Sequence, residues 1–124
     1  MKTILLCALG ARWSHSSLAL PCLVKAAAGL PVRAAEYNIN DSPDEVTERI
    51  VSVGADAVGF SCYIWNIGFV LTVASAVKKL IPGCTILLGG PEVSFDAPEL
   101  MDRHRFIDII IRGPGEAPFR RFAE

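Results

Sequence analysis

Four short segments of the sequence concentrate residue types that bind ligands or transfer protons. These segments are 10–17, 62–66, 89–95 and 112–116. They contain both tryptophans, one of the two tyrosines and one of the two histidines, which are Trp13, Trp65, Tyr63 and His15. Five glycines accompany these residues, and a glycine lets a ligand come close to the backbone. Large aromatic side chains beside glycines favour a flat or bulky ligand.

His15 has the most versatile side chain of this set, because an imidazole can ligate a metal ion or hold a catalytic proton. No second ligand stands at a metal-binding spacing, so we expect no metal site built from this chain alone. The neighbouring Ser14 and Ser16 can equally satisfy the imidazole within its loop. Glu92 and Glu116 could meet at the same ligand, or each could favour a helix N-terminus.

Several common sites are absent from the sequence. It has neither the lysine of a P-loop nor a G-x-G-x-x-G motif after the first predicted strand. The serines at 14, 16 and 17 could hold a flavin phosphate at a helix N-terminus, or could only cap that helix. The net charge is -1 and no Lys/Arg run occurs, which argues against nucleic-acid binding. The longest nearly apolar stretch, 18–32, is too short and too interrupted to cross a membrane.

The four cysteines show no close C-x2-C spacing of the kind that binds zinc or an iron–sulfur cluster. Cys7, Cys62 and Cys84 lie in or beside apolar runs, and Cys22 is the fourth. This placement favours buried free thiols over disulfides. We therefore expect a cytoplasmic protein.

Short apolar runs alternate with longer amphipathic segments along the chain. Predicted strands cover 2–8, 32–37, 57–61, 85–88 and 106–111. Ser42 and Glu45 form a capping box that begins a helix, and Gly54 ends it. Asn66 is the expected N-cap of the next helix, which ends at Pro82. Further helices are predicted over 17–29 and 96–102, and from Glu116 onwards.

Strands that are continuously apolar are buried on both faces, which is typical of a parallel sheet between helices. The 124 residues suit one domain, 1–124. We expect a Rossmann-like or flavodoxin-like α/β fold, with a doubly wound five-stranded parallel sheet of order 2-1-3-4-5. In this order, ligands bind at the carboxyl ends of strands one and three, where the winding reverses.

Three of the segments resemble the N-terminal cobalamin-binding domain of the B12-dependent radical SAM proteins, which include the anaerobic magnesium-protoporphyrin IX monomethyl ester cyclase and various methyltransferases. The matching residues are 59–63 (GFSCY), 88–92 (LGGPE) and 108–116 (DIIIRGPGE). The last resembles the family's D-x-x-x-x-G-E-G-E segment, with Pro114 in place of its first glutamate.

The resemblance implies that cobalamin lies across the carboxyl ends of the strands, with its nucleotide tail near Ser61, Gly89 and Gly90. The implied cofactor-binding residues are Trp13, Ser14, His15, Ser16, Ser61, Cys62, Tyr63, Trp65, Gly89, Gly90, Pro91, Glu92, Gly113, Gly115 and Glu116. It assigns no catalytic residue to this chain.

The chain also departs from related patterns. His15 lacks the Asp and Gly of the D-x-H-x-x-G signature, so the sequence favours a cobalt that no histidine ligates. Tyr63 stands where other cobalamin-binding families carry the Leu of S-x-L. No C-x3-C-x2-C triplet occurs, so this chain holds no radical SAM 4Fe–4S cluster.

We therefore interpret the chain as an N-terminal fragment that positions cobalamin for a radical SAM domain of the same parent chain. S-adenosylmethionine and the 4Fe–4S cluster would bind in that other domain, and the fragment alone would bind rather than catalyse. Two alternatives remain: a degenerate fold of this type that acts as an interaction module, and a flavodoxin-like FMN or small-molecule enzyme that uses His15.

Overall fold

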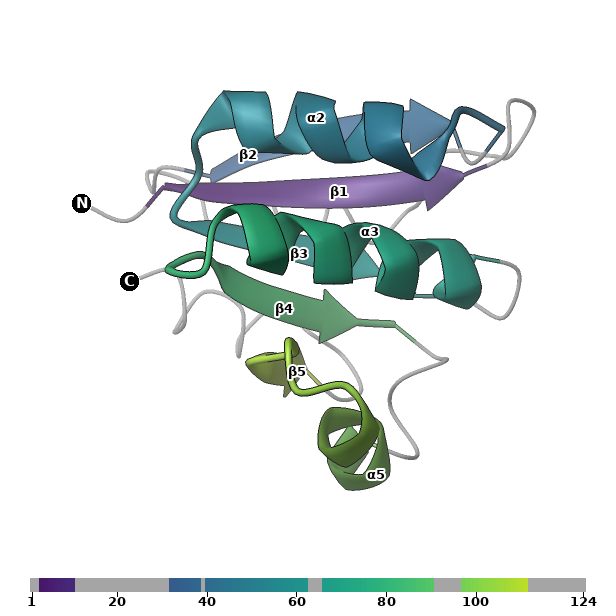
Figure 1. Cartoon of the computed structure of the whole chain (residues 1–124), viewed down its shortest axis with the longest axis vertical. Coiled ribbons are helices and arrows are strands. Elements are labelled where there is room, and N and C mark those ends of the chain that lie inside the picture. The colour runs from purple at the N-terminus through teal and green to yellow at the C-terminus, as the bar shows by residue number, and fades with distance from the viewer. Residues whose placement is uncertain (1–2, 11–31, 39, 63–65, 91–96, 112–124) are drawn as a thin grey trace.

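The computed structural model describes residues 3–10, 32–38, 40–62, 66–90 and 97–111. In chain order the elements are β1 (Ile4–Gly10), β2 (Val32–Asn38), α2 (Pro43–Val53), β3 (Ala57–Ser61), α3 (Ile67–Leu80), β4 (Thr85–Gly89), α5 (Ala97–Arg103) and β5 (Ile109–Ile111). The strands form one parallel sheet of order β2-β1-β3-β4-β5 (Figure 1), which confirms the predicted fold. The helices predicted over 17–29 and from Glu116 lie outside the described residues.

The strand pairings differ in how far they reach toward the carboxyl edge of the sheet. β1 pairs with β2 along its whole length, up to Gly10 opposite Asn38. β3 pairs with β4 up to Ser61 opposite Gly89. Between β1 and β3, however, pairing ends at Cys7 opposite Phe60. The sheet is therefore continuous at its amino edge and parted between β1 and β3 at its carboxyl edge.

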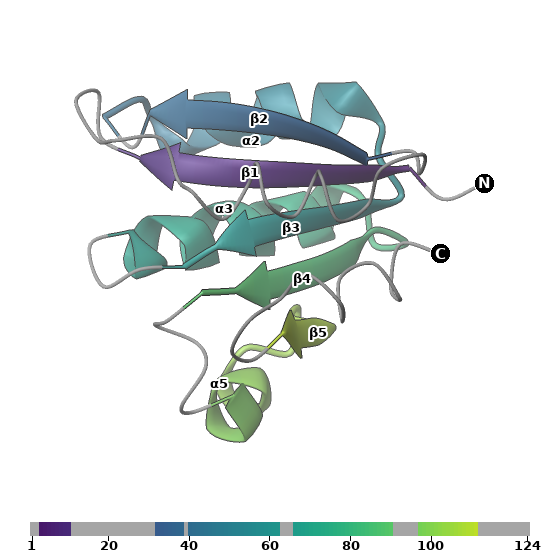
Figure 2. The same ribbon diagram turned by 180° about the vertical axis from the view of Figure 1, so that it is seen from behind.

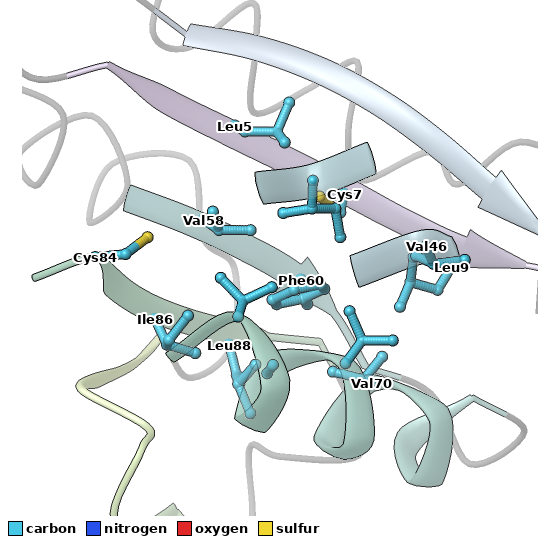
Figure 3. Packing of buried hydrophobic residues seen from close by; sticks show 14 of the residues in the cluster. Leu5, Cys7, Leu9, Val46, Val58, Phe60, Val70, Cys84, Ile86 and Leu88 are labelled. Atoms are coloured by element: carbon cyan, nitrogen blue, oxygen red, sulfur yellow. The ribbon is translucent and has the colours of Figure 1, made fainter. Parts of the chain in front are cut away.

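Helices α2 and α3 lie side by side on one face of the sheet (Figure 1). Successive side chains of a strand point to opposite faces, so alternate residues of β1, β3 and β4 meet these helices. Figure 3 shows the resulting core, which includes Leu5, Cys7, Leu9, Val46, Val58, Phe60, Val70, Cys84, Ile86 and Leu88. Every residue of β3 is buried, including the polar Ser61 at its end.

The opposite face of the sheet, seen in Figure 2, has a second and smaller cluster of buried side chains. It consists of Ile4, Leu6, Ala57 and Leu87. Gly59 lies between two of these residues, because a Cβ there would be 2.9 Å from Leu6 Cδ2 and 3.4 Å from Leu87 Cδ2. The leucines thus pack over the glycine in the middle of this face.

The local signals of α2 are confirmed. Ser42 Oγ accepts a hydrogen bond from the Glu45 backbone N–H at 3.1 Å, and Pro43 opens the helix. Gly54 has φ +73° and donates its N–H to the Val51 carbonyl, which is a left-handed cap.

The strand predicted over 106–111 was wrong in its first half, because β5 begins at Ile109. The Asp108 backbone N–H donates to the Ile86 carbonyl, and an Asp108 carboxylate oxygen accepts from the Ile86 N–H at 2.8 Å. Ile107 is buried in the core instead of extending the strand. The first strand was also predicted to end at residue 8, whereas β1 continues to Gly10 along β2.

The cysteine prediction is confirmed for the three described thiols. Cys7, Cys62 and Cys84 are free and buried. Burial raises the pKa of the Cys7 and Cys84 thiols above their ordinary value. Cys22 lies outside the described residues. No helix in the described ranges is long and apolar enough to cross a membrane.

Candidate functional site at the carboxyl edge of the sheet

The ends of β3 and β4 bring four of the predicted site residues together. Ser61 pairs with Gly89, and the Cys62 backbone N–H donates to the Gly89 carbonyl at 2.7 Å. Gly90 follows directly and also contacts Cys62. Residues 28 positions apart in the sequence thus form one junction, which we call the β3–β4 junction (Ser61, Cys62, Gly89, Gly90).

Position 90 requires a glycine because of its backbone conformation and its contact with Cys62. Its φ is +105°, a conformation that L side chains rarely adopt. A Cβ at this position would lie 2.5 Å from the Cys62 carbonyl oxygen and 2.8 Å from the Cys62 nitrogen. The Cys62 backbone therefore occupies the volume that a side chain at position 90 would need. The absence of a side chain at Gly90 lets the ends of β3 and β4 come into contact.

Gly89 has space around it among the described residues at the same edge. Of these residues, only Ile111 would come near a Cβ at Gly89, through its carbonyl oxygen at 3.8 Å, which is ordinary contact. Gly89 alternates with Leu87 and Ser61 with Gly59, so both belong to the face opposite α2 and α3. The described residues therefore fit a ligand segment that approaches the backbone at Gly89, beside the small side chain of Ser61. Further from the edge, Leu6 and Leu87 close the face over Gly59.

Asn66 has a role at this edge that sequence reasoning missed. It was predicted to cap α3, but its side chain makes no cap hydrogen bond. Its Nδ2 instead donates to the Leu9 carbonyl at 2.9 Å and to the Ser61 carbonyl at 3.0 Å. The side chain is buried, at 2% exposure. Only its position just after a strand end hinted at such a role, because Leu9 is 57 residues away.

The remaining predicted site residues lie outside the described part of the chain. They are Trp13, Ser14, His15, Ser16, Tyr63, Trp65, Pro91, Glu92, Gly113, Gly115 and Glu116. Their segments follow the carboxyl ends of β1, β3, β4 and β5 in the sequence, and in a parallel sheet these ends share one edge. Their roles stay predictions. Within the described residues, no group of three or more His, Cys, Asp or Glu side chains could hold a metal ion.

The family follows from comparison with known proteins. The family model for the B12 binding domain matches residues 3–123, which is nearly the whole chain. The chain therefore belongs to the B12-binding domain family. This membership agrees with the resemblance drawn from the strand-end motifs.

Three curated relatives are similar to parts of the chain. A 2-(S-pantetheinyl)-carbapenam-3-carboxylate methyltransferase of Streptantibioticus cattleyicolor is 37% identical over 65 residues, or 52% of this chain. The cobalamin-dependent radical SAM methyltransferase TokK of Streptomyces tokunonensis is 34% identical over 76 residues, or 61%. The hopanoid C-3 methylase of Methylococcus capsulatus is 32% identical over 92 residues, or 73%. The matched regions span only 10%, 11% and 18% of these relatives' lengths.

Two solved structures share the fold. A putative pilus assembly-related protein from Burkholderia pseudomallei superposes with a TM-score of 0.59 at 18% identity, covering 96% of this chain and 89% of that one. RcsB from Salmonella enterica serovar Typhimurium superposes with a TM-score of 0.60 at 11% identity, covering 99% of this chain and 68% of that one. At such low identity the similarity concerns the arrangement of strands and helices alone.

Proposed function

We propose that this chain is the cobalamin-holding domain of a cobalamin-dependent radical SAM enzyme and that it positions the cofactor for a radical SAM domain elsewhere in the same parent protein. The observation that supports this proposal most is the family match over residues 3–123, with a parted carboxyl edge at the fold's switch point. Relatives named as methyltransferases and a methylase suggest methyl transfer as the parent reaction. S-adenosylmethionine and the 4Fe–4S cluster would belong to the other domain.

Each part of the edge has a proposed task. The cofactor's nucleotide tail would lie along the face of Ser61 and Gly89, where the glycine leaves room and the hydroxyl can hydrogen-bond. The aromatic side chains of Trp13, Tyr63 and Trp65 would cover the corrin and exclude water. His15 would line the site without ligating cobalt.

When bound, cobalamin would supply the methyl-transfer chemistry or tune a radical step. The chain would contribute orientation, a dry environment and a fixed distance to the neighbouring domain. No catalytic residue is assigned to this chain.

The space at Gly89 gives a direct test of the tail's location. The variant Gly89→Val keeps an extended backbone that suits valine and adds two methyl groups beyond a Cβ that fits. Those methyl groups would occupy the volume assigned to the tail, so cobalamin affinity should fall at least about tenfold, or ~1.4 kcal/mol. Calorimetric titration with hydroxocobalamin measures this change.

The matched control is Gly83→Val, which lies before β4 at the opposite edge, where a Cβ would meet no described residue within 4 Å. It should bind cobalamin like the unaltered chain. If Gly89→Val is folded by circular dichroism and still binds with unaltered affinity, the proposed location of the tail is wrong.

A further inference from the structure

Among the described residues, one side chain bridges the gap between the carboxyl ends of β1 and β3. Pairing between these strands ends at Cys7 and Phe60, although β1 continues along β2 and β3 continues along β4. The carbonyls of Leu9 and Ser61 lie beyond the last pair, on opposite sides of the gap. Both accept hydrogen bonds from Asn66 Nδ2, at 2.9 Å and 3.0 Å.

The chemistry of this bridge is specific to a primary amide. One amide nitrogen carries two N–H groups, so it can donate to two carbonyls at once. An aspartate of the same shape has no donor when ionised, and a serine has one. A glutamine is longer by one methylene and would have to displace α3 to make the same contacts.

The position of Asn66 itself is fixed by helix α3. Asn66 is joined to α3 because its carbonyl accepts from the Val70 N–H at 2.9 Å. Val70, Val73 and Val77 of that helix are fully buried against the sheet. A well-packed core resists displacement, so the amide is a fixed point for the two strand ends.

We propose that Asn66 is a positioning residue that sets the separation of the β1 and β3 carboxyl ends and thereby shapes the edge at which cobalamin would bind. The first half of this inference concerns the protein alone, and the second half rests on the proposed function.

The test compares Asn66→Asp with Asn38→Asp. Both variants exchange an amide for a carboxylate of the same size and add the same charge. Asn38 uses its Oδ1 to accept from the Asn40 N–H at 2.8 Å, a bond that a carboxylate retains, so it controls for charge. Hydroxocobalamin titration should show at least tenfold weaker binding for Asn66→Asp and a change within twofold for Asn38→Asp.

A second readout needs no cofactor. In the free protein, amide NMR shifts of Ser61 and Cys62 should move in Asn66→Asp and stay unchanged in Asn38→Asp. If the unaltered chain fails to bind cobalamin, the proposed function fails, while these shifts still decide whether Asn66 holds the strand ends. Unmoved shifts overturn the inference.

The Ile50→Val variant controls for a general loss of stability, because it removes a buried methyl group from α2, away from Asn66. While folded, this variant should bind cobalamin within twofold of the unaltered chain. If Asn66→Asp does not fold, Asn66→Ser, which retains one donor, takes its place with the same expected results. Equal weakening of cobalamin binding by Ile50→Val, or unchanged binding by the Asn66 variant, shows that Asn66 does not position the ligand.

Discussion

Two glycines with positive φ should differ in how much stability the protein loses when each is replaced by alanine. Gly54 and Gly90 have φ values of +73° and +105°. A Cβ at Gly54 would meet none of the residues that the structure describes within 4 Å, whereas one at Gly90 would collide with the Cys62 backbone. The first glycine only ends a helix, while the second joins two strand ends at the candidate site.

This contrast predicts different losses for two alanine variants. Gly54→Ala should lower the free energy of unfolding by about 1 kcal/mol, the usual cost of a left-handed alanine. Gly90→Ala adds a backbone collision that cannot relax by rotating a side chain, so its loss should exceed about 3 kcal/mol. Urea denaturation followed by circular dichroism measures both values. Equal losses would show that the Gly90–Cys62 contact is not rigid.

The sequence predicted where several site residues lie, but not why those residue types are needed there. The motifs around Ser61 and Gly89 correctly marked where two strands end. The reason for Gly90 was not visible, because it depends on Cys62, which lies 28 positions earlier. Asn66 is the N-cap residue of α3, as predicted, but the contacts of its side chain were not visible, since one partner is in β1, 57 residues away.

At the scale of elements, β5 is attached to β4 by a side chain as well as by backbone pairing. Asp108 Oδ2 accepts from the Ile86 N–H at 2.8 Å and from Lys78 Nζ at 2.7 Å. Lys78 Nζ also donates to the Cys84 carbonyl at 2.8 Å. One carboxylate thus ties α3, β4 and the start of β5 together, and β5 leads to the predicted 112–116 segment.

Replacing this carboxylate should loosen the edge strand. Asp108→Ala leaves the Ile86 N–H without its acceptor, and we expect a loss of about 1–2 kcal/mol in the free energy of unfolding. The ion pair itself adds little, because both side chains are partly exposed, at 25% and 37%. Chemical denaturation checks the value. The exposed Asp102→Ala is the control, and an equal effect from both variants would contradict this account.

Elements specified by nearby residues were predicted well. The helix α2 has its cap, its proline and its terminal glycine within twelve positions of one another, from Ser42 to Gly54. The start of β5 was mispredicted because Phe106 and Ile107 are apolar for another reason, which is packing against the core. A run of apolar residues does not say whether they pair or only pack.

At the scale of the whole molecule, the strand order was predictable because it follows from the alternation of buried strands and helices. The early end of β1–β3 pairing was not, since it reflects contacts among three elements. We propose that cobalamin binds at the edge where this parting lies.

The buried thiols predict how stability depends on pH. Burial, with a smaller contribution from nearby Cys84, raises the pKa of Cys7 above its ordinary value of 9.0. Burial also raises the pKa of Cys84 and of Tyr37. Above pH 9 the unfolded chain therefore loses protons that the folded chain keeps, so the free energy of unfolding should fall as pH rises.

Each fully shifted group contributes a slope of up to ~1.4 kcal/mol per pH unit. Urea denaturation between pH 7 and about 10.5 should show a plateau and then this decline. Cys7→Ala lacks one such group, so its decline should be shallower. A slope that is identical in the variant would mean that the Cys7 thiol ionises as readily in the folded chain as in the unfolded one.

The most direct test of the central claim is an anaerobic titration of the chain with hydroxocobalamin and methylcobalamin, followed by calorimetry and visible spectra, with FMN as the comparison ligand. We predict one-to-one cobalamin binding with a Kd near 1 μM, worth about 8 kcal/mol, and no FMN binding. The His15→Ala variant should give the same affinity and spectrum. A folded chain that does not bind cobalamin at millimolar concentration, or that binds FMN more tightly than cobalamin, would contradict the account.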